Sequence, residues 1–256
     1  MLTIGLASFA AFCIDARGFL PEKQFNERAH GASPDVTSIA LLGDSWIATG
    51  DLGGNIKHEM ANTGWVVDLV SFGEPGARSK KIYQNLFAHQ DREFSSRPIL
   101  FGEEAYDFVV VVAGVNDAAG YMGADFYVHH MALIIDAISK RGSTAVIVEL
   151  PEFGLEETDS NNPVGFLRRR IFRLLFHDSR VDVISQYRAA LETWLEIHKA
   201  REDYILVDFD QVADDYTKHT DLYKSDLVHL NEKGNVALAR AISAEIQMRL
   251  ADKGGS

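Results

Sequence analysis

Cysteine is almost missing from this chain: Cys13 is the single one among 256 residues. A lone cysteine rules out a disulfide within the chain, which fits a reducing compartment but does not exclude export. It also rules out a zinc site built from several cysteines. Because Cys13 lies in an apolar stretch, where a buried thiol is usually inert, we do not expect it to act as a nucleophile.

Basic residues are also in short supply. The chain has 25 Lys and Arg against 37 Asp and Glu, which gives a formal net charge of -12. Nonspecific binding of nucleic acids depends on contacts between Lys or Arg and phosphates, so we expect no nucleic-acid partner. The same charge disfavours electrostatic attraction of polyanionic substrates unless a local basic patch overrides it, and it favours solubility.

Long apolar runs are scarce, and the one at the start, from Met1 to Ile14, is too short to span a bilayer. No Lys or Arg precedes this run, because the first basic residue of the chain is Arg17, and no suitable small-x-small cleavage site follows it. The run therefore lacks features of a signal peptide. We expect residues 1–35 to form an N-terminal extension that packs on the domain. The alternative is a trimmed membrane anchor or signal. The cytoplasm is therefore slightly favoured as the location, and the alternative would place the protein in the cell envelope or outside the cell.

Five short apolar runs recur along the rest of the chain. Such continuous hydrophobicity is typical of strands that are buried on both faces. Helix-like stretches lie between them, at residues 124–141, 183–199 and 234–250. This alternation predicts one α/β domain over residues 1–256, with a parallel sheet between helices. The expected strands are residues 36–42, 65–72, 108–113, 145–150 and 204–207.

One long irregular region leaves the fourth expected strand. Residues 152–163 are rich in Glu, Asp, Ser and Asn, and residues 166–176 have the pattern of a basic amphipathic helix. We interpret residues 152–176 as an insertion near the active site, because loops at this edge of a sheet shape ligand sites. The helix fits a lid, a membrane-touching face or a site for anions, but an ordinary surface helix is favoured. Membrane contact is expected only here or through residues 1–14.

Small and polar residues follow the expected strands. Ser45 follows the first strand in Gly43-Asp44-Ser45, and Asp226 and His229 lie together far downstream. A serine nucleophile needs a base and a third group that orients the base. Each motif is weak alone, but their shared position at strand ends indicates a serine hydrolase.

With Gly76 and Asn116, these residues resemble the four blocks of the SGNH, or GDSL-type, hydrolase superfamily. Ser45 matches the first block, Asn116 the third, and Asp226 with His229 the fourth. Gly76 best matches the second block. Gly73 stays an alternative, because the Asn that the superfamily often has before this glycine is missing here. The resemblance implies a flavodoxin-like three-layer α/β/α sandwich with strand order 2-1-3-4-5.

The resemblance also implies roles for these residues. Ser45 would attack an ester carbonyl, His229 would act as general base and then acid, and Asp226 would orient the imidazole. The backbone N–H groups of Ser45 and Gly76 and the side-chain amide of Asn116 would form the oxyanion hole. No cofactor is expected.

The substrate pocket is expected to include Trp46, Asp44 and Asp117. Trp46 stands where the superfamily usually has Leu, and its bulk beside the serine favours a short acyl group.

We therefore expect a hydrolase of short acyl esters, such as an acetylated carbohydrate. The alternatives are acyl transfer to a sugar hydroxyl, or a catalytically silent domain that binds glycan or protein. No metal site is expected, because the third block reads Gly114-Val115-Asn116-Asp117, and His129 and His130 fall inside an expected helix. The acyl group, the alcohol and the oligomeric state stay open.

Overall fold

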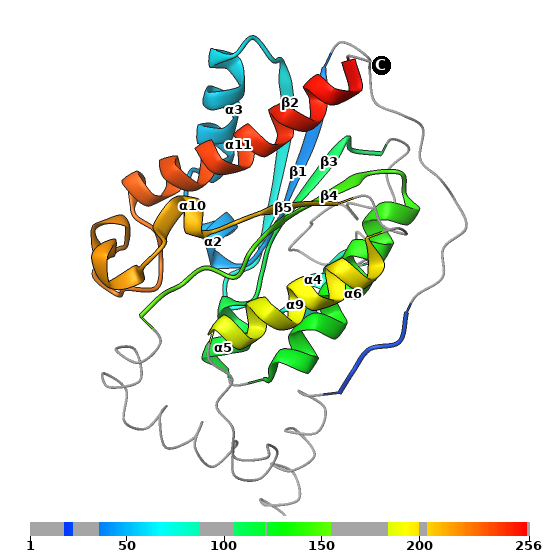
Figure 1. Ribbon diagram of the computed structural model, residues 1–256, viewed down its shortest axis with the longest axis vertical. Coiled ribbons are helices and arrows are strands. Elements are labelled where there is room, and N and C mark those ends of the chain that lie inside the picture. Colours follow the sequence, from blue (N-terminus) through cyan, green and yellow to red (C-terminus); the bar gives the residue numbers. More distant parts are fainter. Residues whose placement is uncertain are drawn as a thin grey trace, which may run out of the picture.

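Five parallel strands form the centre of the protein in a computed structural model (Figure 1). It describes residues 18–22, 36–87, 105–120, 122–154, 184–199 and 204–254. The strand order is β2-β1-β3-β4-β5, which confirms the predicted order. The strands are β1 (Thr37–Gly43), β2 (Val67–Gly73), β3 (Phe108–Val112), β4 (Thr144–Val148) and β5 (Tyr204–Val207).

The register of the strands sets the position of the site. Gly43, the last residue of β1, pairs with Gly73 of β2 and with Val112 of β3. These three strands therefore end level with one another, and the loops that follow them start at a common edge. Every residue of β3 and β4 is buried, as expected for strands covered on both faces.

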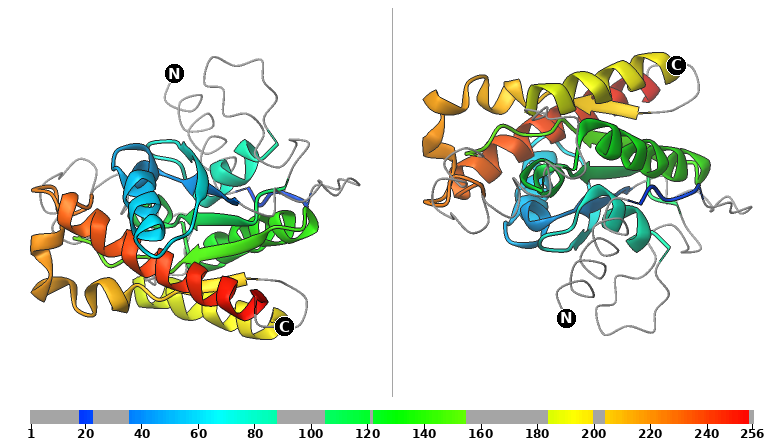
Figure 2. Two further views of the ribbon diagram at one scale, coloured as in Figure 1. Left: turned by 90° about the horizontal axis from the view of Figure 1, so that it is seen from above. Right: turned by 90° about the horizontal axis from the view of Figure 1, so that it is seen from below.

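Helices cover both faces of the sheet (Figures 1 and 2). One layer contains α3 (Leu52–Asn62) and α11 (Glu232–Gly254), which pack against each other. The other contains α4 (Ser79–Asn85), α6 (Ala124–Lys140) and α9 (Ile184–His198), with α6 in contact with both neighbours. Buried hydrophobic residues of the strands and of these helices form one continuous core. The three predicted helices are thus present, and α11 extends beyond the predicted 234–250 at both ends.

Short helices occupy the carboxyl edge of the sheet and the connection into α11. They are α2 (Ser45–Ala48), α5 (Val115–Ala119), α10 (Asp210–Ala213) and the 3₁₀ helices η1 (Tyr216–Lys218) and η2 (Thr220–Leu222). Residues 1–14, with Cys13, and the expected basic helix at 166–176 lie outside the described residues. Among the helices that are described, none combines the length and apolar character needed to cross a membrane.

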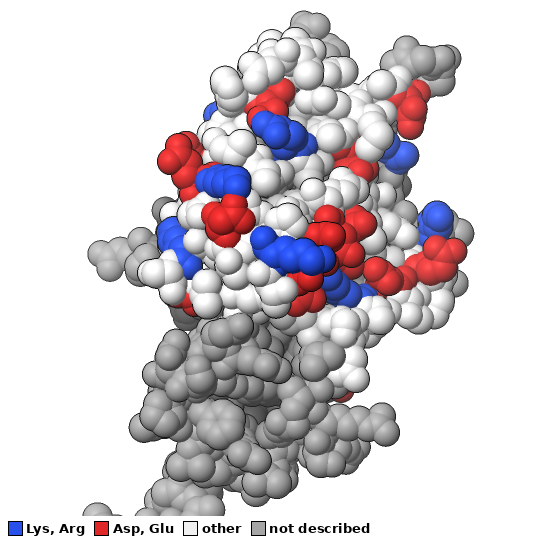
Figure 3. All heavy atoms as spheres, turned by 60° about the vertical axis from the view of Figure 1, so that its left-hand side comes forward, with Lys and Arg blue, Asp and Glu red and all other residues white. Residues whose placement is uncertain are grey.

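Acidic and basic side chains are interspersed on the face shown in Figure 3. Among the ion pairs between elements is that of Arg240 on α11 with Glu59 on α3. The described residues on this face form no continuous basic surface of the kind that nucleic acids require.

Candidate active site

Ser45 stands at the start of α2, directly after β1. Asp44 caps this short helix, and its Oδ1 accepts a hydrogen bond of 3.0 Å from the Trp46 backbone N–H. Ser45 is 8% exposed, so only a small part of it reaches the protein surface. A strand end followed at once by a capped turn holds the serine above the sheet edge, where ligands bind in open α/β folds.

His229 and Asp226 reach Ser45 from the loop that precedes α11. His229 Nε2 lies 3.0 Å from Ser45 Oγ, and His229 Nδ1 lies 2.7 Å from Asp226 Oδ2. Asp226 Oδ1 also accepts bonds of 2.9 Å from the backbone N–H groups of Val228 and His229. Burial would raise the pKa of Asp226, but the bonds from His229 and Val228 outweigh it and hold this pKa below its ordinary value. The three side chains form a continuous hydrogen-bonded chain.

The loop that carries Asp226 and His229 is closed on itself. Tyr223 and Leu230 form an antiparallel bridge, and Lys224 N–H donates to the His229 carbonyl at 2.7 Å. Between the two catalytic candidates, Leu227 has a φ of 56°, a left-handed conformation that is rare for a residue with a side chain.

The same loop is tied to the segment after β4. Gly154 N–H donates to the Leu227 carbonyl at 2.7 Å, and the Tyr223 hydroxyl donates to the Glu152 carbonyl. The described beginning of the expected insertion at 152–176 therefore contacts the loop that carries the base.

Gly76 and Gly73 differ in their surroundings. Gly76 has a φ of 77° and is exposed, with nothing within 4 Å of the position a Cβ would take. Gly73 ends β2, and a Cβ there would lie 2.4 Å from the Ala48 backbone nitrogen. A backbone N–H that must meet a substrate oxygen has to be open to ligand, so the geometry favours Gly76 over Gly73.

Asn116 links the loops after β1 and β2. Its Nδ2 donates to Asp44 Oδ2 at 3.2 Å and to the Ala77 carbonyl at 3.0 Å. An amide nitrogen has two hydrogens, so both are engaged here. A substrate oxyanion bound by Asn116 would have to share or replace one of these bonds.

Asp44 and Asp117 do not line a pocket, which corrects the prediction. Both are fully buried. Asp117 accepts bonds from the Ser79 backbone N–H at 2.9 Å and from the Ser79 hydroxyl at 2.7 Å, which ties α5 to the start of α4. Asp44 supports α2 and Asn116. Both carboxylates therefore position the loops that surround Ser45.

Burial changes the acidity of both carboxyl groups. It raises the pKa of Asp44 to about 7, with a further contribution from the nearby charge of Asp117 and against the bonds from Trp46 and Asn116. It raises the pKa of Asp117 to about 6, against the bonds from Ser79 and the charge of Arg78.

Trp46 is also a structural residue, so the prediction that it lines the pocket is wrong. It is 3% exposed, and its ring packs edge-on against those of Phe209 and Tyr223 at centroid distances of 6.0 and 6.4 Å. Position 46 is the second residue of a short helix that turns its side chain into the core. Its position next to Ser45 in the sequence therefore did not show which way its side chain points.

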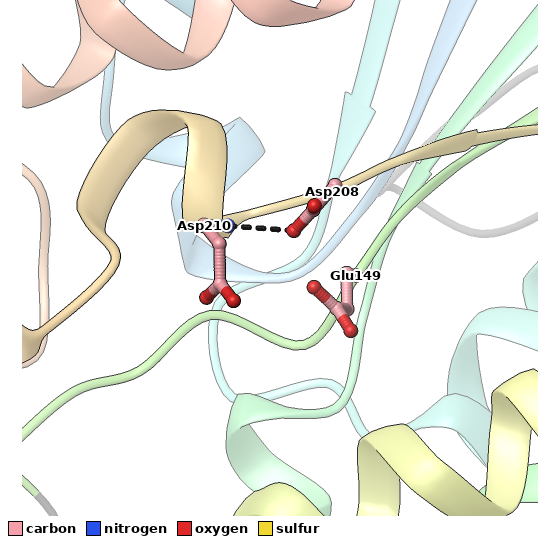
Figure 4. A group of neighbouring side chains, drawn as sticks. All are labelled: Glu149, Asp208 and Asp210. Carbon is pink, nitrogen blue, oxygen red and sulfur yellow. Dashed lines mark hydrogen bonds between the residues drawn. The ribbon is translucent and has the colours of Figure 1, made fainter.

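One acidic group near the sheet edge was missed by the sequence analysis. Glu149 follows β4, and Asp208 and Asp210 follow β5, so that their carboxylates face one another within 4.8 Å (Figure 4). Oxygen ligands of this kind suit a hard cation. The guanidinium of Arg188, however, lies 3.3 Å from Asp210 and 3.9 Å from Glu149 and supplies positive charge to the group. The sequence offered one signal for this acidic group, which is the charged Glu149 at the end of an apolar strand.

His129 and His130 lie in α6, as predicted. His129 Nε2 bonds to the Leu20 carbonyl at 2.8 Å, and His130 Nδ1 bonds to the Phe126 carbonyl at 2.8 Å. The two histidines therefore hold residues 18–22 on α6. Burial lowers the pKa of His130 to about 4, which keeps it neutral.

The sequence profile of the GDSL-like lipase/acylhydrolase family matches residues 41–237. Comparison with curated protein sequences finds no significant match.

Solved structures share the fold at low identity. A lipase/acylhydrolase from Enterococcus faecalis aligns with a TM-score of 0.61 and 18% identity, covering 83% of this chain and 96% of its own. An esterase from Pseudoalteromonas sp., inhibited by monoethylphosphonate, has a TM-score of 0.57 and 14% identity, with coverage of 84% and 99%. An acetylxylan esterase from Geobacillus stearothermophilus has a TM-score of 0.57 and 15% identity, with coverage of 82% and 94%. With the profile match over most of its length, this chain belongs to the GDSL-like lipase/acylhydrolase family and is a carboxylic ester hydrolase.

Proposed function

We propose that the protein hydrolyses a short acyl ester, such as an acetylated carbohydrate, through an acyl-serine intermediate. The observation that carries this proposal is the hydrogen-bonded chain from Ser45 Oγ through His229 to Asp226, with distances of 3.0 and 2.7 Å. In it a nucleophile, a base and an orienting carboxylate stand in sequence.

The reaction proceeds in two halves. His229 Nε2 takes the hydroxyl proton while Ser45 Oγ bonds to the ester carbonyl carbon, which gives a tetrahedral oxyanion. The bond to the alcohol then breaks, and His229 returns its proton to the leaving oxygen. In the second half, a water molecule gives its proton to His229 and attacks the acyl-serine, and collapse of that adduct releases the acid and restores Ser45. Asp226 holds the ring and stabilises its charged form in both halves.

The oxyanion needs hydrogen-bond donors that are already in position. The backbone N–H groups of Ser45 and Gly76 are two of them, and Gly76 is open to ligand. Asn116 supplies the third, by turning one amide hydrogen from Asp44 or Ala77 toward the substrate oxygen. One such side-chain donor typically lowers the barrier by about 3 kcal/mol.

The open edge of the site supports a bulky, polar alcohol. The side chains of Asp226 and His229 are 47% and 31% exposed, so a bulky substrate such as a sugar ester can reach them. The acetylxylan esterase similar in fold is named for an acetylated carbohydrate. Acyl transfer to a sugar would require that water be kept from the acyl-serine, and the exposure of His229 favours hydrolysis.

The test combines substrate profiling with labelling of the nucleophile. Purified protein is assayed on p-nitrophenyl esters from acetate to palmitate and on acetylated polysaccharides, with released acid as the readout. A fluorophosphonate probe followed by peptide mass spectrometry then locates the modified residue. Acetate preference and labelling of Ser45 are expected. Preference for palmitate would contradict the short acyl group, and labelling elsewhere would contradict the mechanism.

A further inference from the structure

A cavity of about 450 Å³ begins at the loop that carries Gly76 and runs along α4. Gly76 and Ala77 are among its lining residues, and the Ala77 carbonyl accepts the bond from Asn116. Asn116 in turn contacts Asp44, the neighbour of Ser45. Gly76 of the candidate oxyanion hole thus lines the cavity directly, and one hydrogen bond joins Ala77 to Asn116.

The charge of this cavity opposes that of the chain. Its charged lining residues are Arg78, Lys80, Lys81 and Glu74, whereas the whole protein has a net charge of -12. Glu74 lies 4.0 Å from Lys81 and accepts a bond from Asn85, so it balances one cation in part. A positive cavity in an acidic protein is the local exception that would attract an anion.

The two lysines are the cations that carry this inference. Arg78 is partly committed elsewhere, because its guanidinium lies against Gly120 and its charge lowers the pKa of the buried Asp117. The side chain of Lys81 is 45% exposed. Lys80 lies close enough to α6 for its charge to lower the pKa of His130.

Leu20 also lines the cavity, and residues 18–22, to which it belongs, are held in place by contacts with α6. The Leu20 carbonyl and N–H contact His129 and His130 on α6 at 2.8 and 3.4 Å. Phe19 stacks on His130, and Glu22 pairs with Lys140. A wall held by contacts on both sides of Leu20 makes a preformed site, which lowers the entropic cost of binding.

We propose that the cavity between residues 18–22 and α4 is a subsite for an anionic group, a carboxylate or a phosphate, carried by the alcohol part of the ester. The inference rests on the proposed ester hydrolysis and names its substrate class. Lys80 and Lys81 bind the anion as point charges. An ester with such a group is held with its carbonyl at the Gly76 loop.

The experiment compares three acetates that differ in charge: phenyl acetate, 4-carboxyphenyl acetate and 4-acetoxyphenyl phosphate. We measure kcat/KM for wild type, Lys80→Gln and Lys81→Gln. The ratio of each anionic ester to phenyl acetate should fall about two- to fivefold per lysine, the range for partly exposed charge pairs, and the effect should shrink in high salt. The phosphate and carboxylate arms show which anion the subsite prefers.

Two further variants control for general effects. Glu74→Gln removes the competing carboxylate while its amide oxygen can still accept the bond from Asn85, so it should raise the same ratios. Lys57→Gln removes a charge from an exposed position on α3 and should leave them unchanged. Two results would overturn the subsite. One is an equal loss of kcat/KM on neutral and anionic esters. The other is a ratio of anionic to neutral ester that stays unchanged in Lys80→Gln, Lys81→Gln and Glu74→Gln.

A binding measurement separates this inference from the catalytic proposal. Calorimetry with phenyl phosphate is done on the Ser45→Ala protein, with and without Lys81→Gln. Binding that weakens with Lys81→Gln supports the subsite even if the esters are not turned over. The opposite result would be that Ser45→Ala does not bind phenyl phosphate, while wild type hydrolyses phenyl acetate in a reaction that requires Ser45. That result would contradict the subsite and leave the proposed hydrolysis standing.

Discussion

Ser45 Oγ and His229 Nε2 lie 3.0 Å apart although the two residues are 184 positions apart in the chain. The serine follows β1, which lies between β2 and β3 in the sheet, and the histidine lies in the loop before α11. Their contact depends on the folding of the sheet and the return of the chain to its edge.

Replacing Ser45, the proposed nucleophile, should abolish turnover and leave the fold intact. Ser45→Ala removes one hydroxyl at a position that is 8% exposed, so we expect thermal unfolding close to wild type. Loss of a triad nucleophile leaves only binding and oxyanion effects, so kcat should fall by at least about a thousandfold. The measurement is acetate release from phenyl acetate, with circular dichroism as the folding control. Activity within tenfold of wild type would exclude Ser45 as nucleophile.

The base and its orienting carboxylate should act as one unit. His229→Ala should cost nearly as much activity as Ser45→Ala, and Asp226→Asn somewhat less, because effects within a triad are not additive. Rates of the single variants and of Ser45→Ala/His229→Ala test this. A double variant much slower than either single one would contradict it.

Asp44 should make the protein less stable as the pH rises. Its pKa is about 7 in the folded protein against an ordinary value of 3.8, so the folded state holds the proton more tightly. Stability from this group is complete below about pH 4 and is lost as the pH rises through 7, at about 1.4 kcal/mol per pKa unit. Asp117, with a pKa of about 6, acts in the same direction.

Urea unfolding at pH 5 and pH 8 measures this effect. Asp44→Asn should flatten the fall in unfolding free energy between the two values. The exposed Asp68→Asn, on β2, serves as the matched control and should keep the wild-type slope. If the unfolding free energy falls equally with pH in wild type and in Asp44→Asn, Asp44 has the same pKa in the folded and the unfolded protein, which would contradict the prediction.

The left-handed residue in the catalytic loop predicts an unusual order of substitutions. Glycine adopts a φ of 56° freely, whereas a β-branched residue is strongly disfavoured there. Leu227→Gly should therefore keep the loop and activity within about tenfold of wild type, and Leu227→Ile should be less stable than Leu227→Gly by about 1 kcal/mol or more. Urea midpoints and kcat of both variants decide it. The reverse order would mean that side-chain packing of Leu227 outweighs its backbone conformation.

Chelation should leave the activity unchanged. The proposed reaction uses Ser45 and His229, and the carboxylates of Glu149 and Asp210 already have Arg188 beside them. Hydrolysis is measured before and after dialysis against EDTA, with readdition of Zn²⁺ or Mn²⁺. Loss of activity that either metal restores would point to metal-dependent hydrolysis.

The sequence was sufficient for the parts of the fold that depend on pattern. Continuous apolar runs located the five strands, and the polar residues after them brought Ser45, Asp226 and His229 together as candidates. It was insufficient for the direction in which neighbouring side chains point. Trp46 and Asp117 adjoin site residues in sequence, yet a turn of short helix directs each into the interior. The pairing of Arg188 with Glu149 and Asp210 depends on three separate elements, which no local pattern reveals.

The closed loop between Tyr223 and Leu230 carries both His229, the proposed base, and Asp226, its proposed carboxylate partner. The loop is held by the Tyr223–Leu230 bridge, by the hydrogen bond between Lys224 and His229, and by hydrogen bonds to Glu152 and Gly154. The sheet, in contrast, is held by a buried core. Local opening of such a small unit costs less free energy than global unfolding. We therefore expect mild denaturant or warming to remove activity reversibly while the sheet persists, so that loss of activity reports on this loop before it reports on the fold.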